Sequence, residues 1–464
     1  MLKDIKDSSF LTLGDKFYTK TKATPLENPK LVSYNTELAK EMGIDEEFLK
    51  SEDFVKLLNG ERELNSFASA YAGHQFGYFV PNLGDGRALN LGEIDKYQLQ
   101  LKGSGLTSYS RDGDGRAVLR SSIREYLISE GMHGLGIPTT RALGLITSDT
   151  KVKRETLESG AIVLRVSPSW IRFGSFELAY LGKNKKQDVK ALADFVIDQS
   201  YKHLKEKENR YEELYFEIVD NTTQMIALWQ AYGFMHGVMN TDNMSILGLT
   251  IDYGPYAFME TFDRGFICNL SDHEGRYSYE NQPYIAQWNL QILAKMFFHI
   301  ADKDLMESYV NTFIGKYKKK YFNIMYKKLG LSKEQKDDKK LLSELLNALS
   351  KDSLDYTSFF YTLTKMNYEQ IEGKNIKVWL EKYLKRLELE DCKMSKELMK
   401  KSNPKYILRN YILQEAINDA EQGDYKLINE LLKIAQNPYD EHTGFDRYIK
   451  INKNDLSIKC SCSS

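Results

Sequence analysis

Residues 236–254, HGVMNTDNMSILGLTIDYG, hold the side chains best suited to chemistry. Asp242 and Asn243 are neighbours in a polar stretch, and Asp252 follows an apolar run. Carboxylate and amide oxygens are hard ligands, so Asn243 and Asp252 favour Mg²⁺ or Mn²⁺ bridging the phosphates of a nucleotide. A carboxylate such as Asp242 can also accept the proton of a hydroxyl group. The stretch therefore predicts a metal-dependent, nucleotide-using site.

The spacing resembles two loops of protein kinases, in which His-x-Asp-x-x-x-x-Asn is followed by a hairpin and Asp-Phe-Gly. His236 and Asn243 match, and Asp252 opens Asp-Tyr-Gly. We expect a helix that ends at Gly237 and a small apolar hairpin before Asp252. The position of the kinase base holds Val238, which cannot accept a proton. Either the chain is an inactive kinase, or the base has moved to Asp242.

Two other catalytic classes lack their motifs. The sequence contains no His-Glu-x-x-His and no Cys-x-x-Cys, so a zinc site is not indicated. It also contains no Gly-x-Ser-x-Gly, so a Ser/His/Asp hydrolase has no nucleophile.

Glycine turns and two strands must position phosphate-binding groups in the first half of the chain. Gly84 and Gly86 stand in the turn LGDGR, where backbone N–H groups can face a phosphate and Arg87 adds charge. Alternating residues predict a strand over 88–94 and its hairpin partner over 97–103, which ends near Lys102. A helix with Glu125 on its core-facing side follows the turn DGDGR at 112–116. Taken singly, Lys102 and Glu125 would be read as surface residues, but with the 236–254 loop they match the strand lysine and helix glutamate that position nucleotide phosphates in kinase-like folds.

Two arginines complete the set of cations. Arg165 interrupts the apolar strand expected over 161–167 and shares a face with Val163. Such an arginine needs an anion, either a structural carboxylate or a nucleotide phosphate, and the sequence leaves both open. Arg172 follows in SWIRFG.

Composition excludes several partners. The net charge of −1 over 464 residues gives no electrostatic reason for binding nucleic acid or an anionic membrane. No run approaches the roughly 20 apolar residues of a membrane helix, and the start MLKDIKDSSF has no signal-peptide pattern. We therefore expect a soluble, cytoplasmic protein. Beyond about residue 180 the pattern turns almost wholly helical.

Long motifs carry a family resemblance. The segments at 71–88, 100–144, 234–260 and 403–411 resemble the selenoprotein O, or YdiU, family, and the similarity runs from about residue 65 to the end. The resemblance implies an α+β, protein-kinase-like bilobal fold with an extended helical C-terminal lobe. Residues 1–180 would form an N-terminal extension and an N-lobe, and residues 181–464 a helical C-lobe.

The resemblance also implies an activity. Members of the family transfer AMP from ATP to Ser, Thr or Tyr hydroxyls of proteins, and they bind the nucleotide in the orientation opposite to that in kinases. Asp242 would be the proton acceptor, and Asn243 and Asp252 would hold Mg²⁺ or Mn²⁺. The nucleotide would be bound by Gly84, Gly86, Arg87, Lys102, Asp114, Gly115, Glu125, Arg165, Arg172 and Asp252.

The C-terminal residues KCSCSS depart from the family pattern, which ends in Cys-x-x followed by selenocysteine or cysteine. Cys462 occupies the selenocysteine-like place, but Cys460 is one residue too close. A redox role and an ordinary frayed tail are both open.

The sequence thus predicts a protein adenylyltransferase, with a phosphotransferase or an inactive nucleotide-binding scaffold as alternatives. It does not define the target proteins or the oligomeric state.

Overall fold

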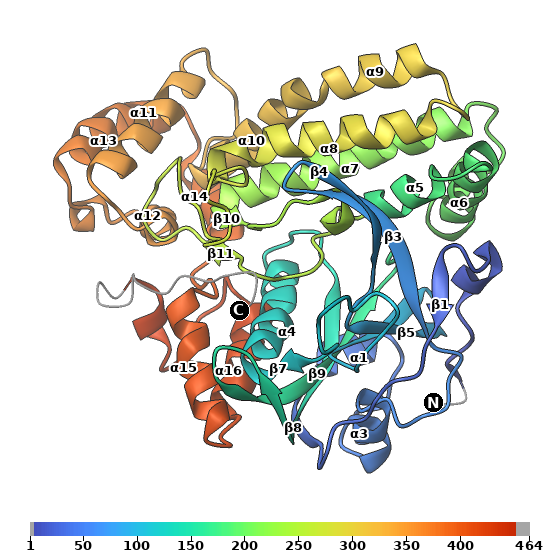
Figure 1. Ribbon diagram of the computed structural model, residues 1–464. Coiled ribbons are helices and arrows are strands. Elements are labelled where there is room, and N and C mark those ends of the chain that lie inside the picture. Colours follow the sequence, from blue (N-terminus) through green and yellow to red (C-terminus); the bar gives the residue numbers. More distant parts are fainter. Residues whose placement is uncertain (1–3, 452–464) are drawn as a thin grey trace.

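An antiparallel, nine-stranded sheet forms the N-terminal part of the computed structural model, which describes residues 4–451 (Figure 1). The main path runs β1-β3-β5-β6-β9-β8-β2, with β4 paired to β3 and β7 to β9. The strands are β1 Tyr18–Lys20, β2 Lys30–Tyr34, β3 Phe67–Gln75, β4 Tyr78–Gly84, β5 Ala88–Ile94, β6 Tyr97–Lys102, β7 Ala117–Val118, β8 Arg141–Lys153 and β9 Leu157–Ser167. The α+β class predicted from the sequence is confirmed.

The two faces of the sheet differ because side chains alternate along each strand. Leu99 and Leu101 of β6 and Leu164 of β9 pack into one apolar cluster with the short helices α1 Thr36–Glu41, α2 Glu46–Leu49 and α3 Glu52–Leu58. The opposite face of β6 and β9 carries the buried polar residues Gln100 and Arg165. The alternation therefore aims charged and amide groups at one side of the sheet.

Helix α4 Leu119–Gly134 packs on β8 and β9 and carries Glu125 on a buried face. The C-terminal helices α15 Asn410–Glu421 and α16 Lys426–Gln436 return to pack on α4 (Figure 1). Residues about 300 positions apart thus form one apolar cluster, which includes Ile128 of α4 and Leu431 of α16.

The remaining helices form the other part of the molecule, in which α7, α8 and α10 pack together. They are α5 Phe173–Ala179, α6 Lys185–Ser200, α7 Arg210–Tyr232, α8 Gln282–Phe297, α9 Lys303–Asn311, α10 Phe313–Lys328, α11 Asp338–Lys351, α12 Tyr356–Thr364, α13 Lys374–Leu387 and α14 Cys392–Ser402. Short 3-10 turns are η2 Ser9–Leu13, η3 Lys202–Leu204, η4 Thr241–Asn243, η5 Tyr279–Asn281, η6 Tyr368–Gln370 and η7 Asp446–Tyr448. Among residues 4–451, no helix has both the length and the apolar composition needed to cross a bilayer.

Two local predictions were wrong. Helix α7 ends at Tyr232 rather than at Gly237, because Gly233 adopts a left-handed conformation (φ 68°) that terminates it. The strand β10 Phe234–Met235 then pairs with β11 Ala257–Phe258. Residues 244–251 do not form a hairpin, since Ser245 instead bridges to Arg172 and Thr250 to Thr139.

Candidate active site

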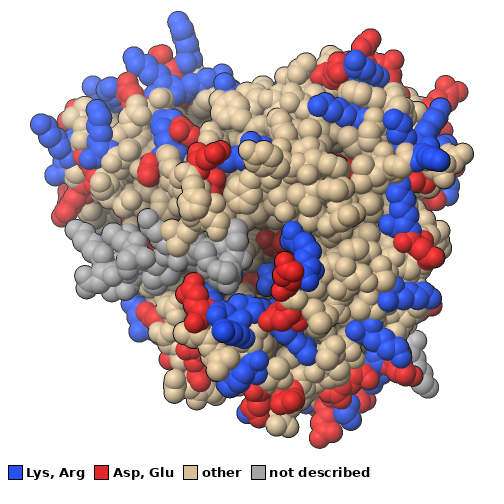
Figure 2. Space-filling model, in the orientation of Figure 1, with Lys and Arg blue, Asp and Glu red and all other residues tan. Residues whose placement is uncertain are grey.

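A cavity of about 430 Å³ brings the predicted site residues together. Its wall includes Gly84, Gly86, Arg87, Lys102, Asp114, Gly115, Arg165, Arg172, Asp242, Asn243 and Asp252. Glu125 alone of the predicted set does not line it. Seven basic side chains face only four aspartates there, and charges of both signs gather near the centre of the face in Figure 2. The excess positive charge suits a polyphosphate.

Lys102 links two carboxylates at the base of this cavity. Its Nζ lies 2.7 Å from Oε2 of Glu125 and 2.8 Å from Oδ1 of Asp252, so the predicted Lys102–Glu125 ion pair is present. Arg165 Nη1 lies 2.9 Å from Oε1 of Glu125, which gives this arginine a carboxylate partner while it still lines the cavity. Burial disfavours charge on Glu125 and Asp252, but the neighbouring cations outweigh it and lower the pKa of both carboxyls.

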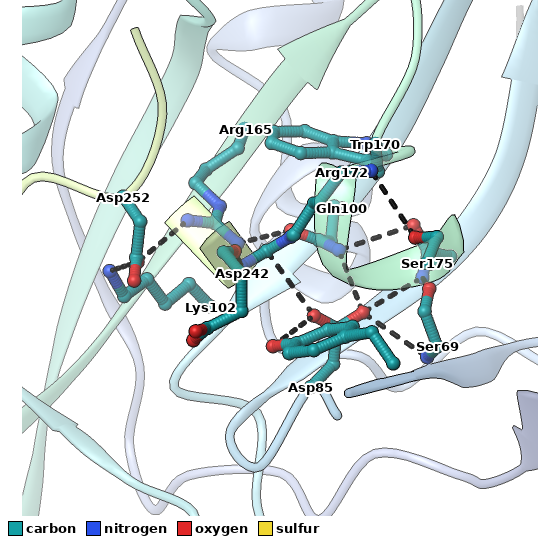
Figure 3. Close-up of polar contacts among 12 residues, drawn as sticks. Ser69, Asp85, Gln100, Lys102, Arg165, Trp170, Arg172, Ser175, Asp242 and Asp252 are labelled. Atoms are coloured by element: carbon teal, nitrogen blue, oxygen red, sulfur yellow. Dashed lines mark hydrogen bonds and ion pairs between the residues drawn. The ribbon is translucent and has the colours of Figure 1, made fainter. Parts of the chain in front are cut away.

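Asp85 anchors Arg172 and was not singled out from the sequence (Figure 3). Its carboxylate is buried, accepts hydrogen bonds from Ser69 N and Gln100 Nε2, each at 3.2 Å, and lies 3.4 Å from Arg172 Nη2. Arg172 Nη1 donates to the carbonyl of Asp242 at 2.9 Å. Asp85 therefore couples the β4–β5 turn to the loop that carries Asp242. Its position between Gly84 and Gly86 was the sequence feature that could have marked it as a site residue.

The glycines of the β4–β5 turn allow close packing. A Cβ added at Gly84 would lie 2.3 Å from Cγ of Tyr109, and one at Gly86 would lie 2.8 Å from the Tyr109 carbonyl oxygen. The turn must lack side chains for the segment around Tyr109 to lie against it. Contact of these glycines with phosphate stays a prediction.

The DGDGR turn is the most exposed part of the predicted set. Asp114 Oδ2 lies 2.7 Å from Arg154 Nη1, and Asp114 Oδ1 accepts from Arg116 N at 2.9 Å. Asp114 is exposed; its slight desolvation opposes ionisation, but these donors outweigh it and lower its pKa. Arg154, which the sequence analysis missed, thus holds this turn at the cavity wall.

Asp242 is a buried carboxylate, and only one of its two oxygens accepts a hydrogen bond from the described residues. Its Oδ2 accepts a hydrogen bond from Gln75 Nε2 at 3.1 Å, whereas Oδ1 has no hydrogen-bond partner among residues 4–451. Burial raises its pKa to about 6, although Gln75 and Arg172 act in the opposite direction. Gly73 makes room for it, because a Cβ there would lie 2.7 Å from Oδ1. A carboxylate that is ionised at neutral pH yet more basic than usual can serve as a general base.

The neighbouring Thr241 ties the same loop to β3 and α5. The backbone N–H of His74 donates to Thr241 Oγ1 at 2.7 Å, and His74 Nδ1 lies 2.6 Å from Glu177 Oε2. Burial raises the pKa of Glu177 to about 7, with Thr241 opposing the shift. His74 lies in the motif at 71–88, but neither it nor Glu177, about 100 residues away, was among the predicted site residues.

Asn243 and Asp252 fit a hard cation. Asn243 donates its Nδ2 to the Val238 carbonyl at 3.1 Å, which leaves its oxygen for a ligand. Asp252 has φ 61°, and its Oδ1 is the oxygen that Lys102 contacts. In the described part of the chain, no group of three or more His, Cys, Asp or Glu side chains is placed to hold a metal. The donors that Asn243 and Asp252 offer are amide and carboxylate oxygens, which suit Mg²⁺ or Mn²⁺. Cys460 and Cys462 lie outside the described residues.

His236 has a structural place. Its Nε2 lies 2.8 Å from the Ile251 carbonyl oxygen, and its ring stacks on Trp229 at 5.4 Å. Complete burial lowers its pKa, so the ring is held neutral. It connects the loop of Asp242 to the segment that leads to Asp252.

The basic cavity, the buried base and the oxygen ligands have the make-up of a nucleotide-dependent transferase site. A family model described as protein adenylyltransferase SelO matches residues 2–436, and the chain belongs to that family. The chain is 42% identical to protein nucleotidyltransferase YdiU of Vibrio parahaemolyticus, over 98% of each chain. It is also 42% identical to the proteins of the same name from Aliivibrio fischeri, over 97% of this chain and 96% of the relative, and Myxococcus xanthus, over 95% of each. The family predicted from the motifs is confirmed.

Proposed function

We propose that this protein transfers AMP from ATP to Ser, Thr or Tyr hydroxyl groups of other proteins and releases pyrophosphate. The observation that carries the proposal is the free, buried Oδ1 of Asp242 in the cavity that also holds the basic side chains. The names of the family and its relatives support this choice of reaction.

The sheet-rich residues 1–180 and the helical residues 181–464 would act as the two lobes of a kinase-like fold. The cavity wall supports this division, because it takes Lys102 and Arg165 from the first part and Asp242 and Asp252 from the second. The nucleotide would enter between the two parts.

Lys102, Arg165 and Arg172 would bind the β- and γ-phosphates. Each is buried and already held by a carboxylate, so its position is fixed before ATP arrives. Gly84, Gly86, Arg87, Asp114 and Gly115 would contact the rest of the nucleotide from the cavity wall. With the terminal phosphates on these cations, the α-phosphorus would face Asp242. This inverted placement of ATP rests on the family resemblance.

Asn243 and Asp252 would hold the divalent cation, Mg²⁺ or Mn²⁺. When bound, it would supply positive charge to the phosphates. Lys102 contacts Oδ1 of Asp252, which leaves Oδ2 for the cation. Nδ2 of Asn243 donates to the Val238 carbonyl, which leaves the amide oxygen of Asn243.

Asp242 would take the proton of the acceptor hydroxyl. The hydroxyl oxygen would form a bond to the α-phosphorus, the bond from that phosphorus to the oxygen bridging to the β-phosphate would break, and pyrophosphate would leave. The pKa of about 6 makes Asp242 mostly ionised at neutral pH and still able to retain a proton. Val238 offers no alternative base.

The intact mass of a protein acceptor after incubation with ATP and Mg²⁺ or Mn²⁺ tests this proposal. An adenylyl increment that depends on Asp242 is the expected result. A phosphoryl increment would identify a phosphotransferase, and no increment would favour a scaffold. We also propose a cytoplasmic location, which agrees with the low cysteine content.

A further inference from the structure

The β3–β4 hairpin reaches over the loop of Asp242 with a rigid tip. Its two-residue turn, Phe76-Gly77, has φ values of 50° and 91°, the positive pair of a type I′ turn. A positive φ is strained for a bulky residue such as phenylalanine. The N–H of Phe76 donates to Asn240 Oδ1 and to the Tyr277 hydroxyl, both at 3.1 Å, and its ring packs on Tyr277 at 5.2 Å. The turn is therefore held by Asn240, in the loop that carries Asp242, and by Tyr277.

Two large aromatic side chains stand just beyond this turn. Tyr78 is 79% exposed and Phe79 is 43% exposed. Tyr78 pairs across the hairpin with Gln75, whose amide contacts Asp242. Side chains of directly paired residues share a face, with Cβ atoms about 5 Å apart. Tyr78 thus lies beside Gln75, the residue that contacts Asp242, and its own ring is exposed to solvent.

Exposed aromatic rings on a rigid support are typical of binding hot spots, because little conformational entropy is lost when a partner covers them. Figure 2 shows uncharged surface over much of α5 and α8, and the guanidinium of Arg276 adjoins the tip, 3.5 Å from a Cβ added at Gly77. The hairpin takes part in the cavity wall, since Gln75 beside the turn and Leu83 and Gly84 at the far end of β4 line the cavity. The tip therefore lies beside Asp242, where an acceptor hydroxyl would be bound.

We propose that Tyr78 and Phe79 form a docking point for the acceptor polypeptide, an inference that rests on the proposed transfer to proteins. The partner is an extended segment with an aromatic or large aliphatic side chain close to the acceptor hydroxyl. At about 3.3 Å per residue, an anchor about two to four residues from the hydroxyl spans the distance from Tyr78 to Asp242. Pro81 has no N–H to donate, so side-chain contact rather than an added β-strand provides the binding.

Steady-state transfer of α-labelled ATP to casein, an unfolded acceptor, tests the docking point. Tyr78→Thr and the double variant Tyr78→Thr/Phe79→Thr should raise the KM for casein, the double variant by about 10-fold. The Kd for ATP and the rate at which ATP is hydrolysed to AMP without a protein acceptor should stay within about twofold of wild type. The single variant keeps the contact of Phe79 with His74, so its effect does not depend on disturbing that ring.

The double variant Val378→Gln/Leu389→Gln is the matched control, because these apolar side chains are 57% and 67% exposed on and just after α13. It should leave the KM for casein unchanged. An unchanged KM in the Tyr78 variants, with wild type labelling casein, would overturn the docking point and leave the adenylyltransferase activity standing. An equal rise in the control would also overturn it. Absence of any α label on casein with wild type would remove the proposed function and this inference together.

Discussion

Gln75 donates a 3.1 Å hydrogen bond to one oxygen of Asp242, and the other oxygen has no hydrogen-bond partner among residues 4–451. The hydrogen bond stabilises the charged form of Asp242, whose pKa burial raises to about 6. Because only the ionised carboxylate accepts a proton, kcat/KM should fall as the pH drops through about 6. Gln75→Ala removes a group that lowers the pKa, so this acidic limb should move to higher pH.

A pH profile of kcat/KM measures that limb in the free enzyme. Gln287→Ala is the control, since Gln287 donates only to a backbone carbonyl of Val310. A limb that stays in place in Gln75→Ala would show that Asp242 is not the titrating base.

Gly73 sets the room available to Asp242. An added methyl group would lie 2.7 Å from Oδ1 and 3.0 Å from Cβ of Asp242, so Gly73→Ala must displace the carboxylate. We expect kcat to fall by about 10²-fold, as for a misplaced catalytic group, while the Kd for ATP is retained. Gly315→Ala is the control, because nothing lies within 4 Å of its added Cβ. Equal kcat values for the two variants would contradict this role of Gly73.

Asp252→Asn tests the metal ligands. The substitution keeps the shape of the side chain but removes the charge that a divalent cation needs. Calorimetry should show that Mg²⁺ strengthens ATP binding by wild type but not by Asp252→Asn. Asp85→Asn is a useful comparison, because Asp85 contacts Arg172 but is not a proposed ligand. Retention of the Mg²⁺ effect in Asp252→Asn would remove Asp252 from the metal site.

The strands could be predicted from the sequence more closely than the loops. Period-two alternation predicted strands at 88–94 and 97–103, where β5 spans 88–94 and β6 spans 97–102. One face of each strand packs against apolar residues, and the other carries Asn90 and Gln100. The false hairpin at 244–251 has a different cause. Its residues bridge to Arg172 and Thr139, partners about 70 and 110 positions away that no local pattern reveals.

The same limit applies to the site. Motifs pointed to Lys102, Asp242 and Asp252 because spacing along the chain is enough to mark them. Gln75 and Glu177 were missed, since they act through contacts with Asp242 and His74 that only the folded chain brings together.

Lys328 is buried, whereas the other lysines of residues 316–340 are exposed or partly exposed. It is 2% exposed, lies 4.7 Å and 4.6 Å from the rings of Tyr232 and Phe360, and donates to the Ser402 carbonyl at 3.3 Å. Burial lowers its pKa to about 7. Between about pH 7 and its ordinary pKa of 10.5, the unfolded chain binds more protons at this lysine than the folded chain does. Its contribution to the free energy of unfolding therefore rises with pH.

Lys328→Met should remove that pH dependence. The free energy of unfolding of wild type minus that of the variant should increase from pH 7 to pH 9.5, by at most about 1.4 kcal/mol per pH unit. Lys327→Met is the neighbouring exposed control and should show no such trend. Denaturant unfolding at the two pH values measures the difference, and parallel behaviour of both variants would contradict a neutral buried lysine.

Transfer from ATP labelled at either the α- or the γ-phosphorus tests the central claim most directly. Parallel reactions use wild type and Asp242→Asn with one protein acceptor. The account predicts α label on the acceptor and no γ label with wild type, and a rate about 10²–10⁴-fold lower with Asp242→Asn. Label from the γ-phosphorus alone would contradict it, because the chain would then be a phosphotransferase.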